Sequence, residues 1–374
     1  MTELVDRVRR RLVSEPGDLD GALRAETAGI VDDTVFARLR REVAAELHGA
    51  GPLEPLLAEP GVTDVLVNAP DSVWVDRGGG LRRAAVRFAD DAAVRGLAQR
   101  LAAGAGRRLD DAAPYVDAVL PDGTRMHAVL PPLVASTTLS LRVLARRRLD
   151  LDSLVAAGAM PAEVAQLLRG VVAARRAFVI TGGTGTGKTT LLGALLGQVS
   201  ATERMLLIED ASELAVAHPH VVRLVTRTAN VEGAGAVGLR ELVRQALRMR
   251  PDRLVVGEFR GAEMVELLVA LNTGHEGSAA TLHANSAADV PARFAALGAL
   301  AGLPSPAVTS LVASAVDLIV HLRRLREGRR TVEEIGVLGR QKDELVVGSA
   351  WTATGGEGPA ADRLRALVAD GRHR

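Results

Sequence analysis

The chain has 374 residues, of which 48% are hydrophobic and 24% charged, so its composition is that of a folded protein of two or three domains. Its 46 basic and 45 acidic residues nearly cancel, which argues against an overall field that attracts nucleic acid or an anionic membrane. Aromatic residues make up 2% of the chain, too few for the stacking surfaces that bind single strands. The absence of cysteine excludes a disulfide framework, a thiolate zinc site and a cysteine nucleophile.

The first 148 residues are expected to form a helical segment and then a small α+β domain. Residues 1–49 carry apolar side chains at helical spacing, and the breaker GAGP ends this segment. Residues 50–148 alternate between short β-branched runs and turns. We expect strands at 63–68, 73–76, 81–88, 115–120, 125–132 and 137–144, and a helix at 90–103.

Residues 149–350 have the pattern of an α/β domain with a mostly parallel sheet covered on both faces. We expect strands at 177–181, 205–209, 221–225, 254–258 and 278–283, with helices at 189–196, 239–249 and 261–271. Residues 351–374 are predicted to be a tail that is mobile or docks on a partner. No apolar run is long enough to span a membrane and the N-terminus lacks a secretory signal, so we expect a soluble protein of a reducing compartment.

The strongest motif is a phosphate-binding loop, GGTGTGKT, at residues 182–189. It satisfies G-x-x-x-x-G-K-[ST] and lies between a predicted strand and a predicted helix, where backbone N–H groups and the helix N-terminus can hold phosphates. Lys188 would reach the β- and γ-phosphates, and the Thr189 hydroxyl would bind Mg²⁺. The expected nucleotide-binding residues are Gly182, Gly183, Thr184, Gly185, Thr186, Gly187, Lys188, Thr189 and Thr190. The alternative is a flexible glycine-rich turn.

Lysine usage strengthens this interpretation. Only Lys188 and Lys342 among the 46 basic residues are lysine. The wide planar guanidinium of arginine cannot replace the compact ammonium that fits such a loop. Lys342 lies outside every motif and is assigned no role.

Acidic residues and histidines follow other predicted strands. LLIEDASEL contains Glu209, Asp210 and Glu213, one of which could polarise an attacking water, although a solvated acidic loop is the alternative. Glu258 directly follows an apolar strand, the position of a Walker B acid near Mg²⁺, and a helix cap is its alternative.

His275 and His283 in TGHEGSAATLHANS suit polar contacts to phosphate or carboxylates better than a metal site. Each of them, taken alone, is also consistent with a structural hydrogen-bonding histidine.

Together, and in this order, these segments resemble the secretion ATPase superfamily of type II and type IV secretion. GGTGTGKTT resembles its Walker A motif, LLIEDASEL its Asp box, RMRPDRLVVGEFRG its Walker B motif and TGHEGSAATLHANS its His box. The chain looks most similar to the CpaF-like ATPases of Tad/Flp pilus assembly. The likeness covers about residues 50–340, including PDGTRMHAVLPP upstream and HPHVVRL and VEGAG downstream.

The resemblance implies a RecA-like C-terminal domain preceded by a smaller α+β domain, in a hexameric ring that hydrolyses ATP with Mg²⁺. It implies closure of a cleft between the domains, a cytoplasmic location at the inner face of the cell membrane, and integral-membrane platform proteins as partners. By motif position, Glu213 would activate water and Glu258 would act at the Mg²⁺ shell. His283, with His275, would sense the γ-phosphate or couple subunits.

The resemblance also suggests two arginines that act on the phosphates from the N-terminal domain. Arg125 in PDGTR and Arg142 in SLRVL match by position, although among 44 arginines a solvated surface residue is the alternative. Relatives commonly have an arginine where this chain has Val119, which raises the possibility of weakened hydrolysis. Two alternative functions therefore stand beside the motor: a RecA-like nucleic-acid motor for conjugal transfer, and an ATP-binding scaffold that hydrolyses slowly.

Overall fold

The computed structural model describes residues 2–14, 18–27, 32–47, 49–143, 149–227, 229 and 234–370. Its contacts divide the chain into two compact units, Met1–Ala145 and Arg146–Arg374. The domain boundary expected at residue 148, the end of the strand expected at 137–144 and most of VEGAG lie outside the described residues. The further division of the chain into four parts stays a prediction.

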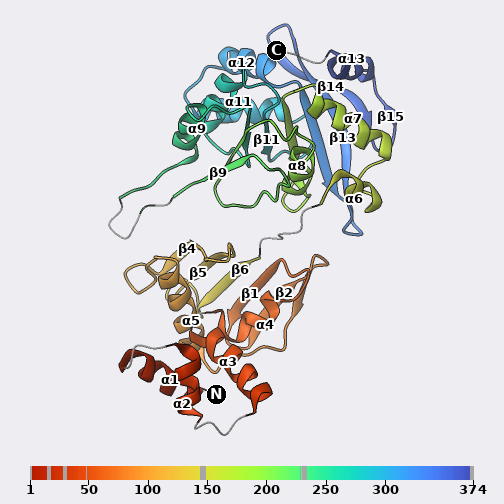
Figure 1. The fold of residues 1–374 in the computed structure, drawn as a ribbon. Coiled ribbons are helices and arrows are strands. Elements are labelled where there is room, and N and C mark those ends of the chain that lie inside the picture. The colour runs from red at the N-terminus through yellow and green to blue at the C-terminus, as the bar shows by residue number, and fades with distance from the viewer. Residues whose placement is uncertain are drawn as a thin grey trace. The chain divides into compact units, whose positions relative to one another are not determined.

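The first unit begins with three helices, as the apolar spacing predicts. They are α1 (Thr2–Ser14), α2 (Leu19–Glu26) and α3 (Asp33–Leu47), and they pack around a small apolar cluster that includes Val8, Leu23 and Val43. A short 3-10 turn, η1 (Gly51–Leu53), and α4 (Glu54–Leu57) lead from them into a sheet (Figure 1).

This sheet has six antiparallel strands in the order β3-β2-β1-β6-β5-β4. The strands are β1 (Asp64–Ala69), β2 (Ser72–Asp76), β3 (Leu81–Arg83), β4 (Tyr115–Val119), β5 (Arg125–Val129) and β6 (Thr138–Arg142). Alternate side chains such as Val65, Val67 and Leu139 are buried in a core shared with α5 (Asp91–Gly104). The strand expected at 81–88 is shorter than predicted, because it ends at Arg83.

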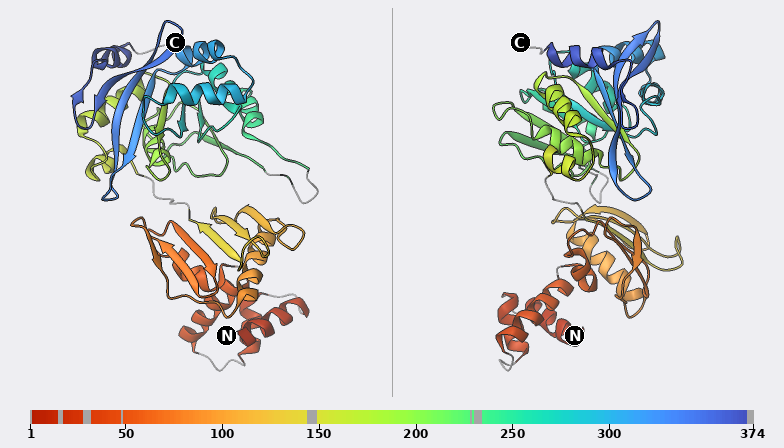
Figure 2. Two further views of the ribbon diagram at one scale, coloured as in Figure 1. Left: turned by 180° about the vertical axis from the view of Figure 1, so that it is seen from behind. Right: turned by 90° about the vertical axis from the view of Figure 1, so that its right-hand side faces the viewer.

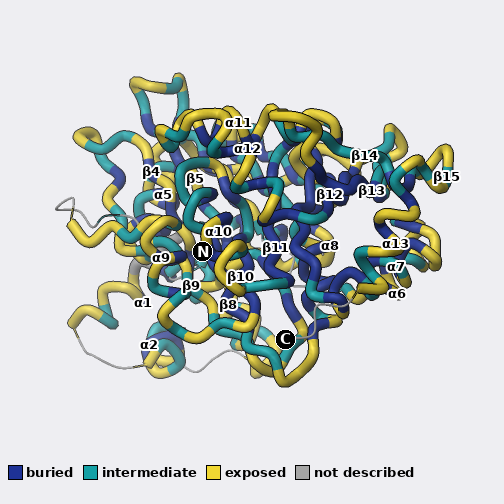
Figure 3. Tube along the Cα trace, turned by 90° about the horizontal axis from the view of Figure 1, so that it is seen from above, coloured by how far each residue is buried: buried dark blue, intermediate teal, exposed yellow. Residues whose placement is uncertain are grey.

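The second unit contains a nine-stranded sheet in the order β15-β14-β13-β12-β7-β11-β10-β8-β9. The parallel part comprises β7 (Phe178–Gly182), β8 (Met205–Glu209), β9 (Val221–Val225), β10 (Arg253–Val256), β11 (Ala279–Leu282) and β12 (Leu318–Arg324). The four central strands β7, β8, β10 and β11 are buried along their whole length, as Figure 3 shows for the middle of this sheet. This burial explains their continuous apolar runs.

Helices cover both faces of the sheet, as expected for an α/β domain. One core contains side chains of α6 (Leu151–Ala156), α7 (Ala162–Ala173) and α8 (Lys188–Leu196). The other contains side chains of α9 (Leu239–Leu247), α10 (Glu263–Leu271), α11 (Val290–Leu300) and α12 (Ser305–Ala315). Successive residues of β7 serve opposite cores, since Phe178 and Ile180 belong to the first and Val179 to the second. The alternation of side chains along a strand produces this arrangement.

An antiparallel extension of the sheet has no counterpart in the sequence-based expectations. β13 (Arg330–Gln341) pairs with β12 through a hairpin, and β14 (Glu344–Thr352) pairs with β13. Their mixed sequences, such as TVEEIGVLG, contain charges and glycines that obscure the period of two.

The C-terminal tail differs from the mobile segment that the sequence suggested. Trp351 and Thr352 lie in β14, and the two-residue strand β15 (Gly356–Glu357) pairs with them. The N–H groups of Gly358 and Ala360 then donate to carbonyls of β14, and α13 (Ala361–Ala369) packs against α7 and β14 (Figure 2). The tail is therefore part of the second unit up to residue 370, and residues 371–374 lie outside the described part.

Candidate nucleotide-binding site

The loop after β7 has backbone conformations that require glycine. Gly182, Gly185 and Gly187 have φ values of +147°, +73° and +95°. A Cβ on Gly182 would lie 2.5 Å from the Leu322 carbonyl oxygen of β12, so this position has no room for a side chain. The loop turns the chain directly into the N-terminus of α8, where backbone N–H groups have no helical partners.

Lys188 is the first residue of α8, and its ammonium is held inside the loop. The Nζ atom donates to the carbonyl oxygens of Gly182 and Gly183, both at 3.0 Å, and the residue is 8% exposed. Burial lowers the pKa of Lys188 below its ordinary value, and Glu258 opposes this effect. The structure thus places the single buried ammonium of the described chain where the motif predicts a phosphate ligand.

Glu258 and His283 lie beside this ammonium, at the carboxyl ends of neighbouring strands. Both ring nitrogens of His283 are 3.4 Å from Lys188 Nζ, and its Nε2 is 2.7 Å from Glu258 Oε1. Arg260 donates to the other oxygen, Glu258 Oε2, at 2.6 Å. The pKa of His283 is lowered, first by burial and then by Lys188, which keeps its ring neutral around pH 7. The predicted Walker A, Walker B and His box residues therefore meet at one edge of the sheet.

Glu209, one of the three acids of which one could polarise an attacking water, is held by hydrogen bonds within the protein. It is 3% exposed at the end of β8, and its Oε1 accepts the backbone N–H groups of Glu213 and Leu214 at 2.9 and 2.7 Å. Its Oε2 accepts from Arg223 at 3.1 Å. Burial raises the pKa of Glu209. Glu209 therefore fixes the turn that presents Glu213, which is partly exposed.

Asp210 lines an open groove at the same edge of the sheet. Polar side chains from three segments share this groove, including Thr226, Arg227, Arg260 and Glu263. The backbone carbonyl of Asp210 accepts from Thr226 Oγ1 at 3.1 Å, which ties the Asp box to the segment after β9.

His275 lies at the wrong end of β11 to join His283. It precedes the strand whereas His283 follows it, and its Nδ1 contacts the Ala270 carbonyl oxygen at 3.1 Å, at the C-terminus of α10. His275 therefore does not join the group formed by Lys188, Glu258 and His283. Its role in sensing the γ-phosphate or coupling subunits stays a prediction.

In the first unit, Arg125 and Arg142 lie side by side. The register of β5 and β6 pairs them directly, and Val119 on β4 is opposite Arg125. Arg142 Nε also donates to Asp64 Oδ1 at 2.9 Å. Val119, Arg125 and Arg142 therefore form one row across the sheet face, since directly opposite residues share a face. Their contact with a nucleotide stays a prediction.

Sequence reasoning missed three polar residues near the loop. Arg260 could have been found from its place next to Glu258 in the Walker B motif. His321 and Arg330 belong to the β12–β13 hairpin, which was not predicted, and an arginine carries little signal in a chain with 44 of them. Thr181 Oγ1 is 2.9 Å from His321 Nδ1, and Arg330 Nε donates to the Gly185 carbonyl at 2.9 Å.

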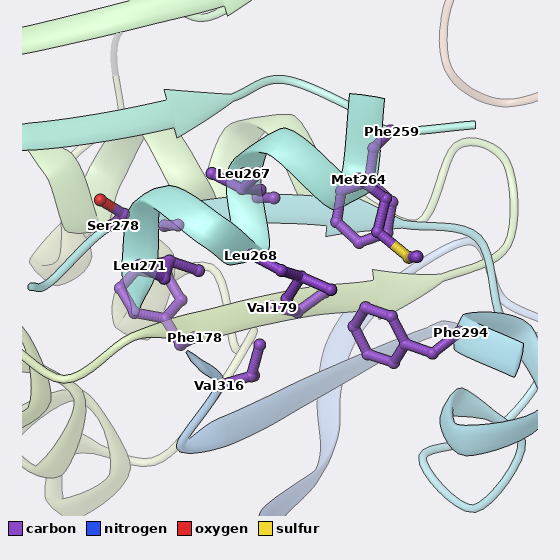
Figure 4. A pocket seen from close by; sticks show the side chains of 12 residues that line it. Phe178, Val179, Phe259, Met264, Leu267, Leu268, Leu271, Ser278, Phe294 and Val316 are labelled. Carbon is purple, nitrogen blue, oxygen red and sulfur yellow. The ribbon is translucent and has the colours of Figure 1, made fainter. Parts of the chain in front are cut away.

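A small apolar cavity lies under the Walker B segment but is not suited to a nucleotide. Figure 4 shows Phe178, Val179, Phe259, Met264 and Phe294 around it. Ser278 is its single polar side chain. A phosphate needs several N–H or cationic donors, which the loop offers and the cavity lacks.

The residues present fit Mg²⁺ bound together with a nucleotide. Within the described ranges no group of three His, Asp or Glu side chains could hold a metal ion by itself. Mg²⁺ in such enzymes is held by one or two protein oxygens together with phosphates and water. Glu258 Oε1 is buried without a hydrogen bond of good geometry, so it can accept from a metal-bound water, and Thr189 lies in the first turn of α8.

Comparison with known proteins assigns the family. The sequence matches the family described as type II/IV secretion system protein over residues 46–362. A Mycobacterium tuberculosis protein named for conjugal transfer is 56% identical over 344 residues, which cover 90% of this chain and 97% of that one. The type IV secretion system protein PtlH of Bordetella pertussis is 33% identical, over 79% of this chain and 95% of that one.

A solved structure supports the α/β fold described above. The pilus retraction motor PilT with bound ADP aligns with a TM-score of 0.54 at 21% identity, over 79% of this chain and 80% of that one. In the described part of the chain no helix is long and apolar enough to cross a membrane. The family match spans most of the sequence and includes every motif that meets at the sheet edge, so the chain belongs to the type II/IV secretion system protein family.

Proposed function

We propose that this protein hydrolyses ATP with Mg²⁺ and so powers a secretion or pilus-assembly machine. One observation carries the proposal: the buried Lys188 ammonium lies within 3.4 Å of His283, which in turn contacts Glu258 at 2.7 Å. These groups come from three strand ends that the sheet brings together. A flexible glycine-rich turn with no ligand does not explain why these three side chains lie together.

Each group has a chemical role in this proposal. The loop N–H groups and Lys188 bind the β- and γ-phosphates; Thr189 and Glu258, the latter through a bound water, would hold Mg²⁺, which would supply positive charge near them. Glu213 orients the attacking water. His283 is neutral and has a single N–H, so donating it to the γ-phosphate would mean giving up its contact with Glu258, whose other oxygen accepts from Arg260.

The finer assignment extends the proposal to the whole assembly. We place the protein with CpaF-like Tad/Flp pilus ATPases, as a hexameric ring that works on integral-membrane platform proteins from the cytoplasmic side. Arg125 and Arg142 would act on the phosphates when the two domains close. A guanidinium that arrives on closure stabilises charge that develops on the transferred group.

A nucleic-acid motor is the second candidate, favoured by the relative named for conjugal transfer. The net charge of +1 and the 2% aromatic content count against direct binding of strands. Salt-dependent binding of single-stranded DNA would support this candidate, whereas its absence would leave a motor that acts on proteins. Tight ATP binding with negligible turnover would favour the slow scaffold instead.

The decisive experiment is steady-state ATP hydrolysis by the purified chain with and without Mg²⁺. We expect Lys188→Ala to lower turnover by roughly 100-fold or more, because it removes the cation that meets the transferring phosphoryl group. Lys342→Ala is the matched control, since Lys342 is the other lysine and lies exposed in the β13–β14 turn. The ATPase proposal fails if turnover is independent of Mg²⁺ or is equal in the wild-type chain and Lys188→Ala.

A further inference from the structure

We propose that Arg330, at the start of β13, is a positioning residue that holds the phosphate loop in its binding conformation. The inference rests on the proposed ATP binding and adds a residue that no motif contains. It is carried by the contact between this side chain and the middle of the loop, 145 residues away in sequence.

Arg330 contacts the loop at Gly185 and lies beside Gly187. Its Nε donates to the Gly185 carbonyl oxygen at 2.9 Å, and its Cδ would lie 3.3 Å from a Cβ at Gly187. Gly185 has a φ of +73°, and because it lacks a side chain nothing of its own restricts the backbone there. The arginine therefore supplies an external restraint at the point where the loop backbone is freest.

The direction of this hydrogen bond matters for phosphate binding. In a trans peptide the carbonyl and the N–H point in opposite directions. Because the Gly185 carbonyl points to Arg330, the N–H of Thr186 points away from the hairpin. A released carbonyl could rotate inward, where its negative end would repel a phosphate oxygen.

The hairpin that carries Arg330 is itself well anchored. β12 pairs with β7 up to Leu322 and Gly182, so the hairpin leaves the sheet beside the first loop residue. Behind it, the buried His321 contacts Thr181 at the end of β7, and Arg323 pairs with Glu333 at 2.8 Å. These contacts fix the backbone of the hairpin, and therefore the position of Arg330, relative to β7 and the loop.

The test compares Arg330→Ala, Arg330→Gln and Arg330→Lys with Arg326→Ala in the full chain. Arg326 is exposed in the same hairpin, so its removal makes the same charge change away from the loop. Affinity for a fluorescent ADP analogue, kcat and KM for MgATP, and the thermal midpoint are measured for each variant. We expect Arg330→Ala to raise the ADP Kd and KM roughly tenfold, the effect of one hydrogen bond to a charged group.

We expect Arg330→Lys to recover part of this loss because an ammonium can still donate to the carbonyl, and Arg326→Ala to match the wild type. Unchanged Kd and KM in folded Arg330→Ala and Arg330→Gln would overturn the inference. Equal losses in Arg326→Ala would also overturn it, because they would show a general charge effect. If Arg330→Ala does not fold, Arg330→Gln takes its place. Unchanged Kd and KM in folded Arg330→Gln would then overturn the inference. A wild-type chain that binds no nucleotide would refute the proposed function instead, which separates the two failures.

Discussion

Glu209 illustrates how a buried motif residue can order the backbone around a site. Its carboxylate accepts two consecutive backbone N–H groups and so closes the turn before Glu213. Gly257, just before Glu258, packs against it, since a Cβ there would lie 3.1 Å from Glu209 Cγ. The Asp box and the Walker B segment are thus held against each other by a buried acid.

Glu209 also predicts a pH dependence of stability. Burial raises its pKa above the ordinary 4.5, so its contribution to the free energy of unfolding is full below pH 4.5 and is lost as pH rises through the folded pKa. We expect the stability of the wild type relative to Glu209→Gln to fall as pH increases from 4.5. Urea unfolding at a series of pH values measures this, with exposed Glu344→Gln as control; parallel profiles for wild type and Glu209→Gln would contradict it.

At the scale of elements, the sequence predicts those with strong local patterns. The apolar runs that became β7 and β8 were placed to within one residue, because buried parallel strands are short and continuous. The phosphate loop was located from β7, and Glu258 from the apolar run that became β10. β13, β14 and the packing of α13 were not predictable, since their stability comes from partners distant in the chain. Arg330 was missed for the same reason.

α13 yields a prediction of its own. Leu364 is 2% exposed and belongs to the core shared with α7 and α8, so Leu364→Ala removes packed side-chain volume. We expect a loss of about 2–5 kcal/mol in the free energy of unfolding. Chemical denaturation provides the measurement, and Leu300→Ala is the control because Leu300 is 76% exposed. Equal midpoints for the two variants would show that the tail is not docked in solution.

At the scale of the whole molecule, the site residues are divided between two units. Lys188, Glu258 and His283 belong to the second unit, whereas Arg125 and Arg142 belong to the first. If all five are to act on one phosphate, that phosphate needs contact with both units, from one chain or from neighbouring copies. The ring expected from the family resemblance is one way to provide it.

The assembly prediction is a change in mass on nucleotide binding. With a non-hydrolysable ATP analogue we expect a species of about six chain masses, because ligand that binds the assembled state shifts association toward it. Sedimentation velocity with and without the analogue measures this, and Lys188→Ala serves as the variant that should not respond. A single-chain mass in both conditions would rule out the ring.

The short strand β15 has a consequence for solubility. A nine-stranded sheet ends in strands whose unpaired backbone groups can template pairing with another molecule, the first step toward aggregation. At the β14 end, β15 pairs with Trp351 and Thr352, and the N–H groups of Gly358 and Ala360 occupy the next carbonyls. Residues 356–360 thereby cover the end of β14 from Ser349 to Thr352, and a truncation after β14 would turn that edge into a surface for strand addition.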